Sequence, residues 1–305
     1  MGRPIATLSA LALVAAGCST SAKLGTTTST AARPQTSTRL TVTRVGSLPQ
    51  ALSKASAVAL PGGKLMILGG YAGGASLDTI LLGTPAHLRA VGHLPEPTHD
   101  AAAAVVQSAV LLFGGGQSAS WPYVVRVDPR TAAAARVQSL DEPLSDLGAV
   151  AIAGKAYLVG GYTGTQFATA ILRYRASGGT AVVARLPQGT RYAGAAAIGH
   201  TIYVAGGLTT TGNSRALYAV SIAGHVRRIG ALPAPEAHAA LAALGGELYY
   251  VGGKRVLKID PRSGKVTTAA SLPASLADPT ATPVGDEIVV AGGGTDGVWA
   301  LRPAA

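Results

Sequence analysis

Short apolar runs recur along the chain, and each one ends in a pair of glycines. The runs read LMIL, VLLF, AYLV, TIYVA, LYYV and EIVVA. The pairs begin at Gly69, Gly114, Gly160, Gly206, Gly252 and Gly292, in steps of 40 to 46 residues. A period of this size is typical of stacked, equivalent supersecondary units. The pattern therefore predicts six copies of one unit.

A second marker has the same register. It is a leucine that lies 20 residues before the glycine pair, or 21 in the first unit, and is followed by proline in all units but the third. These leucines are Leu48, Leu94, Leu140, Leu186, Leu232 and Leu272. Two independent markers in one register make the repeat a firm prediction.

Within a unit, four short apolar stretches are separated by turn residues. In the fourth unit they cover 192–198, 201–205, 216–222 and 225–232. Hairpin signals between such stretches predict a four-stranded antiparallel sheet. Alanine dominates the first stretch of several units, as in AAAAVV and AGAAAI. Such small side chains suit the innermost strand of a ring in which neighbouring sheets converge on an axis.

The two ends of the repeat region complement each other. The sixth unit ends after three predicted strands, whereas residues 39–48, RLTVTRVGSL, form a surplus strand before the first marker leucine. We expect this N-terminal strand to complete the last sheet and close the ring, which removes exposed strand edges.

The first 38 residues predict a different organisation. Residues 1–17 have a basic start and an apolar stretch too short to span a membrane, which is typical of a signal peptide. The sequence VAAGC places Cys18 where bacterial lipoproteins are lipidated. An ordinary secretory signal with an incidental cysteine is the alternative. Residues 18–38 then form a lipidated cysteine and a Ser/Thr-rich tether, and residues 39–305 form the folded domain.

Composition narrows the possible partners. Cys18 is the sole cysteine, so disulfides are excluded from the body of the protein. The formal net charge is +11, which suits contact with an anionic membrane or cell-wall polymers. Neither a basic helix nor interleaved basic and aromatic residues occur, so nucleic-acid binding is not expected. The predicted location is the extracytoplasmic face of the cell membrane, held by a lipid anchor.

The repeat resembles the Kelch family of β-propellers. The resemblance rests on the apolar-Gly-Gly motifs, the tyrosines before some of them, such as Tyr157 and Tyr203, and the Asp-Pro turns at Asp128 and Asp260. It covers residues 39–305 and implies an all-β, six-bladed propeller with four-stranded antiparallel blades. The family's tryptophan in the fourth strand is absent, since Trp121 and Trp299 lie elsewhere.

Polar residues precede each alanine-rich strand, six positions after each marker leucine. They are Lys54, Asp100, Asp146, Tyr192, His238 and Asp278, and His99 and Arg191 come one position before two of them. In a propeller these loops and the loops after the glycine pairs share one face, so Trp121, Tyr162 and Arg215 join the candidate binding face. Any one of these side chains has the alternative role of satisfying neighbouring backbone groups.

The same residues limit the possible chemistry. The histidines are spread over several units without close ligand spacing, so no metal and no cofactor is expected. The copper site of galactose-oxidase-like propellers needs a cysteine, which the body lacks. Neither a Ser-His-Asp order nor a phosphate loop occurs. Six-bladed sialic-acid epimerases, however, place an acid or base beside an arginine, and His99, Asp100, Arg191 and His238 would supply such groups.

Two hypotheses follow. The first is a non-catalytic, membrane-anchored module that docks a protein or glycan of the cell envelope on the loop face. The second is a sialic-acid or other sugar epimerase or mutarotase with acid and base residues at the channel mouth. A recessed pocket with Arg191 beside Asp100 or Asp146 and shifted pKa values favours the enzyme. Exposed Trp121, Tyr162 and Phe167 favour the docking module.

Overall fold

A computed structural model describes residues 39–304 of the chain, which belong to the compact unit Thr36–Ala305. Strands are the regular elements of this part of the chain. It contains no helix long and apolar enough to cross a bilayer. The signal peptide, Cys18 and the tether lie outside the described residues.

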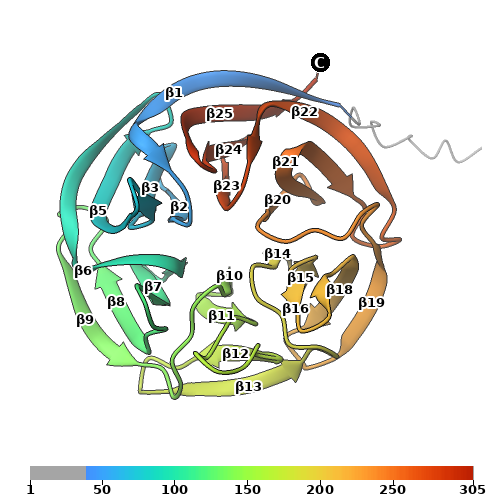
Figure 1. Cartoon of the computed structure of the whole chain (residues 1–305), viewed down its shortest axis with the longest axis horizontal. Helices are drawn as coiled ribbons and strands as arrows, with labels where there is room; N and C mark the ends of the chain where they lie inside the picture. The colour runs from blue at the N-terminus through green and yellow to red at the C-terminus, as the bar shows by residue number, and fades with distance from the viewer. Residues whose placement is uncertain (1–38, 305) are drawn as a thin grey trace, which may run out of the picture. The chain divides into compact units, whose positions relative to one another are not determined.

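The sheets of this unit surround a central axis (Figure 1). The strands nearest the axis are β2 (Ser56–Leu60), the second half of β6 (His87–Val106), β10 (Gly148–Ile152), β14 (Gly194–Ile198), β20 (Ala240–Leu244) and β23 (Pro279–Val284). Small side chains allow these strands to converge. A Cβ added at Gly148 would lie 2.7 Å from the Cβ of Ala195 in the next sheet.

Three sheets have four antiparallel strands. One contains β10, β11 (Lys155–Val159), β12 (Ala170–Tyr174) and β13 (Thr180–Arg185). The next contains β14, β15 (Thr201–Ala205), β18 (Ala216–Ser221) and β19 (Val226–Ala231), beside a ribbon of β16 (Leu208–Thr209) and β17 (Gly212–Asn213). The third contains β23, β24 (Glu287–Gly292), β25 (Thr295–Pro303) and β1 (Leu40–Leu52).

The other repeat units do not form separate four-stranded sheets, which corrects the sequence prediction. The long strand β6 (His87–Val106) pairs with β5 through its first half and with β7 through its second. It joins two units into one eight-stranded sheet of β2, β3 (Lys64–Leu68), β4 (Tyr71–Ala72), β5 (Ala75–Thr84), β6, β7 (Ala109–Gly116), β8 (Tyr123–Val127) and β9 (Ala134–Ser139). The backbone stays extended through the marker Leu94-Pro95, so the expected strand boundary does not occur.

A three-stranded sheet also arises because one long strand replaces two expected strands. It contains β20, β21 (Glu247–Ile259) and β22 (Val266–Leu276). The start of β21 pairs with β20 and its end pairs with β22, so one strand fills two positions. Gly252, unlike the first glycine of the other pairs, does not have a positive φ, and the strand passes through it.

The first described strand pairs with the last one. β1 is antiparallel to β25, in a register that begins with Leu40 opposite Pro303 and reaches Ser47 opposite Gly297. The two ends of the described chain therefore meet in one sheet.

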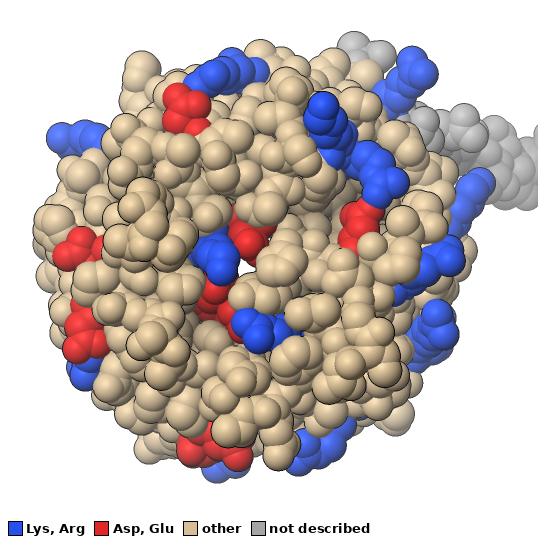
Figure 2. Space-filling model, viewed as in Figure 1, with Lys and Arg blue, Asp and Glu red and all other residues tan. Residues whose placement is uncertain are grey.

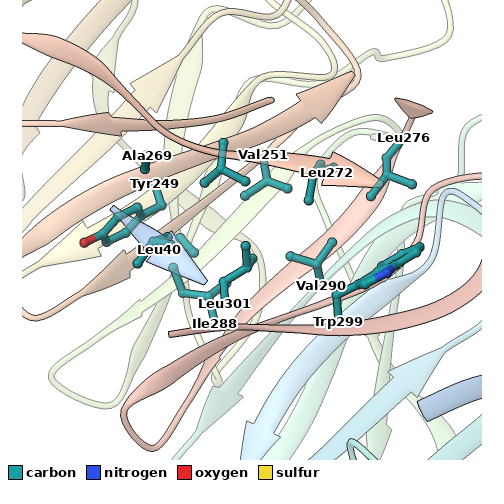
Figure 3. Packing of buried hydrophobic residues seen from close by; sticks show 12 residues of the cluster. Leu40, Tyr249, Val251, Ala269, Leu272, Leu276, Ile288, Val290, Trp299 and Leu301 are labelled. Atoms are coloured by element: carbon teal, nitrogen blue, oxygen red, sulfur yellow. The ribbon is translucent and has the colours of Figure 1, made fainter. Parts of the chain in front are cut away.

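Buried apolar side chains form clusters between consecutive repeat units. The cluster in Figure 3 combines Tyr249 and Val251 of β21 with Val290 of β24 and Leu301 of β25. Another cluster combines Leu65 of β3 with Leu48 of β1 and Val289 of β24, and so connects the first unit to the last. Since one sheet alone leaves its faces exposed, each unit depends on its neighbours for a core.

The glycine pairs connect each unit to the next through the backbone. The amide of Gly161 donates a hydrogen bond of 2.8 Å to the carbonyl of Thr190, four residues after the next marker leucine. Gly160 has a φ of +57°, and a Cβ there would lie 2.4 Å from the same carbonyl oxygen. Gly294 makes the corresponding bond to Leu52 of the first unit. Left-handed backbone and close approach together explain why glycine recurs.

Candidate functional site at the channel mouth

Six equivalent residues form a closed cycle of backbone hydrogen bonds around the axis. Each amide donates to the carbonyl of the corresponding residue one unit earlier, and Lys54 donates to Asp278 to complete the cycle. The N···O distances are 2.8 to 3.3 Å. The members are Lys54, Asp100, Asp146, Tyr192, His238 and Asp278. We call this set the mouth ring.

All members of the mouth ring have left-handed backbone. Their φ values lie between 53° and 60°. In a residue other than glycine this conformation costs about 1–2 kcal/mol, and it persists where the surroundings enforce it. Strain of this kind is concentrated at functional sites in proteins.

The side chains of the mouth ring line a central cavity of about 110 Å³. A second cavity of about 330 Å³ adjoins it and shares Lys54, Asp100, Asp146 and Tyr192. Its other lining residues are His99, Gly116, Gln117, Ser118, Ala119, Ser120, Ser145, Tyr162, Gly164 and Arg191. Figure 2 shows basic and acidic side chains gathered around this central opening.

Asp100 lies at the meeting point of the two cavities. Its side chain is 7% exposed, with Oδ2 at 3.1 Å from Lys54 Nζ and 3.5 Å from His99 Nε2. The hydroxyl of Tyr192 lies 3.5 Å from the same oxygen. Burial, followed by the charge of Asp146, raises the pKa of Asp100 to about 7, although Lys54 acts in the opposite direction. Asp100 is therefore able to hold or release a proton near neutral pH.

Asp146 is the most deeply buried acid of the mouth ring. Its side chain is 2% exposed, and Oδ2 lies 2.5 Å from Nη2 of Arg191 and 3.2 Å from Oγ of Ser145. The guanidinium of Arg191 stacks at 4.6 Å from the ring centroids of both Tyr162 and Tyr192. Arg191 is thus held in place on several sides, and its Nε is buried without a hydrogen-bond partner.

His238 and Asp278 form the second acid-base pair. Nδ1 of His238 lies 2.8 Å from Oδ1 of Asp278, and this hydrogen bond is the main cause that raises the pKa of His238. The imidazole stacks against Tyr192 with a centroid distance of 4.0 Å. Burial, together with the charges of Asp100 and Asp146, raises the pKa of the Tyr192 hydroxyl. Tyr192 therefore remains a proton donor at neutral pH.

His99 is held in place by contacts with Ser76 and Tyr71. Its Nδ1 lies 2.8 Å from Oγ of Ser76, and its ring packs edge-on against Tyr71. Burial and then Lys54 lower the pKa of His99. His99 is neutral at pH 7, whereas His238 is the more readily protonated of the two.

Two of the predicted site residues lie away from these cavities. Trp121 lines a separate space of about 20 Å³ with Tyr123 and Leu94. Arg215 donates from Nε to the carbonyl of Leu232 at 2.7 Å, which connects two segments of its own unit. Their loops belong to the predicted face, but the side chains turn toward structural contacts.

Sequence reasoning missed several polar residues of the site. The hydroxyls of Ser120 and Ser145 share a hydrogen bond of 2.9 Å, and both residues line the second cavity together with Gln117. Ser145 comes directly before a mouth-ring residue, which was the available signal. Ser76 has no such signal, because its contact with His99 depends on how β5 and β6 pair. In residues 39–304, no group of three or more His, Cys, Asp or Glu side chains is arranged to hold a metal ion.

Comparison with known proteins identifies the fold class. No protein-family model matches the sequence, and no curated protein matches it. Among solved structures, one titled "Structure of YjhT" is similar, with a TM-score of 0.72 over 84% of this chain and 95% of that one. The sequence identity is 13%, so the likeness shows the fold alone. The chain is an all-β protein with a β-propeller fold.

Proposed function

We propose that the channel mouth binds a small, sugar-like ligand and catalyses proton transfer on it, as an epimerase or mutarotase does. The supporting observation is Asp100, a buried carboxyl group with a pKa of about 7 that faces the shared part of the two cavities. General acid-base catalysis is most effective when the pKa of the group lies near the working pH.

The neighbours of Asp100 suit this chemistry. Tyr192 supplies a hydroxyl that stays protonated, and His238 supplies a group that is readily protonated on the far side of the ring. A hydroxyl or ring oxygen of the ligand that lies between Asp100 and these two groups has a proton acceptor in Asp100. It has a proton donor in Tyr192 or His238, and all three line the same cavity. Serine hydroxyls and the Gln117 amide extend the second cavity with groups that match sugar hydroxyls.

The depth of the charged groups favours a small ligand over a protein. The side chains of Asp100 and Asp146 are 7% and 2% exposed, which is beyond the reach of a flat protein surface. Tyr162 and Phe167 pack edge-to-face on each other and beside Arg191 instead of projecting outward. Binding hot spots between proteins depend on aromatic anchors that the partner can bury.

The docking module remains the competing proposal. Tyr71 supports it, since this aromatic residue is 36% exposed at the rim, with Lys54 Nζ at 6.0 Å from its ring. A glycan or protein of the cell envelope is the expected partner in that case, and neither nucleic acid nor a cofactor is required.

We also propose a six-bladed, Kelch-type propeller. The eight-stranded sheet then counts as two blades that share β6, and the three-stranded sheet counts as one blade in which β21 supplies two strands. The six-membered backbone cycle of the mouth ring supports this count. The glycine pairs support the Kelch assignment.

The amino-terminal sequence supports export and lipid anchoring through Cys18. The Cys18→Ser chain, expressed in a bacterial host, should appear in the soluble fraction in place of the membrane fraction. Equal membrane association of both chains would contradict anchoring at Cys18.

The catalytic proposal is tested by exchange spectroscopy. Freshly dissolved single anomers of sialic acids and common aldoses are mixed with the protein, and anomer interconversion is followed by NMR; epimerisation is followed by the appearance of the second sugar. We expect the Asp100→Asn variant to lose at least about 100-fold of the rate, which is the usual contribution of a general acid or base. The exposed Asp296→Asn variant is the matched control.

The outcomes separate the two proposals. A pH-rate profile that inflects near 7 and changes in Asp100→Asn supports catalysis. Saturable sugar binding without any rate acceleration would support a sugar-binding site and contradict the catalytic proposal. Capture of an envelope protein that depends on Tyr71, without sugar binding, would favour the docking module.

A further inference from the structure

A broad groove lies on the side of the propeller opposite the mouth, between the second and third repeat units. Its volume is about 740 Å³. The turn from β6 to β7 at Gln107 and Ser108 and the turn from β10 to β11 at Ala153 and Gly154 line it, together with β8, β9 and β12. It shares no residue with the cavities at the mouth.

Strand direction places the groove. β10 begins near Asp146 of the mouth ring and runs away from it to Ile152, where the chain turns back. β12 follows the loop after Gly161 and runs in the same direction to Tyr174. Lys155, Arg173 and Arg175 therefore lie at the end of this sheet that is remote from the mouth.

The groove is basic. Arg126, Lys155, Arg173 and Arg175 line it, and no carboxylate does. Among the described residues, none of these four has an ion-pair partner within 4.0 Å.

The nearest turns use their carboxylates internally. Asp128 accepts the backbone amides of Arg130 and Thr131, and Asp141 accepts the amide and hydroxyl of Thr180. Both carboxylates stay negatively charged near the groove, because these hydrogen bonds, with help from Arg126 and Arg175, lower their pKa values. Neither carboxylate, however, forms an ion pair within 4.0 Å with a cation of the lining.

Apolar side chains line the groove together with the cations. Val106 and Leu111 belong to the lining, and Val137 is 49% exposed, one of the few large apolar side chains at the described surface. A surface that combines unpaired cations with accessible apolar groups matches the interface of a bilayer, where phosphate lies next to acyl chain.

The start of the folded chain lies on the same side. β1 runs from Leu40 toward Lys54 of the mouth ring, so Leu40 lies at the end remote from the mouth. The sequence from Ser19 to Thr38 is attached there. The first described residues and the groove therefore share the side of the propeller opposite the mouth.

We propose that this basic groove binds the phosphate headgroups of an anionic membrane and turns the mouth away from the bilayer. The cations supply the attraction, the exposed valine supplies the apolar contact, and the position of the groove opposite the mouth supplies the orientation. The proposal does not depend on the reaction at the mouth.

Vesicle co-sedimentation tests it on the chain from Ser19 onward, which contains the whole compact unit and carries no lipid. Vesicles of phosphatidylcholine with phosphatidylglycerol are compared with phosphatidylcholine alone at low salt. The test variant is Lys155→Gln, Arg173→Gln and Arg175→Gln. The control removes the same charge elsewhere, on β13 and β19, with Arg185→Gln, Arg227→Gln and Arg228→Gln. Circular dichroism confirms that both variants are folded, and the exposed pair Lys155→Gln and Arg175→Gln replaces the triple variant if it is not.

We expect the unmodified chain to bind anionic vesicles and not neutral ones. Each basic residue near an anionic surface contributes a factor of about 5, so the test variant should bind about 100-fold more weakly and the control should lose little. Equal losses of vesicle binding in both variants would mean that the net charge of the protein alone determines binding, which would overturn the proposal that the groove is the binding site. Binding to soluble polyphosphate without binding to vesicles would overturn the membrane as the occupant.

Discussion

The residues of the mouth ring combine two features that are each unfavourable alone, a left-handed backbone and a buried polar side chain. The backbone cycle compensates for the first, because every amide of the ring has a partner. Ion pairs and hydrogen bonds compensate only in part for the burial of the polar side chains. The uncompensated cost of burying a charge is seen in the raised pKa of Asp100. The residues of the site are thus held by their surroundings in a backbone conformation and a degree of burial that isolated residues would not adopt.

Stability should therefore depend on pH through Asp100. Its pKa is about 7 in the folded state against 3.8 in a model compound, so folding takes up a proton between about pH 4 and pH 7. A raised acid pKa means that stability falls as pH rises through this window. Asn resembles the protonated acid, so the Asp100→Asn chain should match the unmodified chain at pH 4 and exceed it at pH 8 by roughly 2–4 kcal/mol.

Urea unfolding at a series of pH values measures this difference. The control is Asp286→Asn, which changes an exposed carboxylate in the turn between β23 and β24. Parallel pH curves for the unmodified chain and Asp100→Asn would show that Asp100 is ionised at neutral pH like any surface acid.

At the scale of the element, the glycine pair allows the end of the second strand to contact the next repeat unit. It ends the second strand of most units and brings the backbone against the next unit. The conformational requirement and the steric requirement are separable, because other glycines have the same φ without the close approach.

Gly160→Ala and Gly199→Ala should therefore differ in stability. Their φ values are +57° and +58°, but a Cβ at Gly160 meets the Thr190 carbonyl at 2.4 Å, whereas one at Gly199 has no atom within 4 Å. We expect a loss of about 1–2 kcal/mol at Gly199 from backbone strain alone. The loss at Gly160 should be larger by about 1–3 kcal/mol because of the overlap. Urea midpoints measure both, and equal losses would refute the steric role of the pair.

The repeat was visible in the sequence because each physical requirement recurs at a fixed interval. Small residues near the axis, glycines at the unit contacts and polar residues at the mouth all follow from one geometry. Counting six positions from each marker leucine was enough to find Lys54 and Asp278, which lie 224 positions apart in sequence, in one cavity.

Features that depend on a single unit were not visible. β6 and β21 each continue from one strand position of the repeat into the next, although Asp100 and Gly253 within them have positive φ, and the Leu-Pro and Gly-Gly markers permit this course but do not dictate it. The inward turn of Trp121 and the bond from Arg215 to Leu232 depend on packing within one unit. The pairing of Ser76 with His99 depends on register, which the hydrophobic pattern specifies only for the strand as a whole.

At the scale of the whole molecule, a ring has no terminal unit only if its first and last elements pair. Here β1 provides both the hydrogen bonds to β25 and the buried side chains Leu40, Leu48 and Leu52. Without β1, the edge of β25 and one side of two hydrophobic clusters are open to solvent.

Two truncations that differ by 13 residues test this dependence. Starting the chain at Thr36 should leave the urea midpoint and the monomeric elution volume unchanged. Starting it at Pro49 removes the pairing from Leu40 to Ser47 and the buried leucines Leu40 and Leu48, each of which contributes about 1.5–3 kcal/mol, from a total that is usually 5–15 kcal/mol. Because β25 then has an unpaired edge, the shorter chain should aggregate or unfold, and a peptide of residues 36–52 added in excess should restore the monomer. A soluble monomer that starts at Pro49 and has the same midpoint would mean that the ring is held by its other contacts and that β1 is a covering strand.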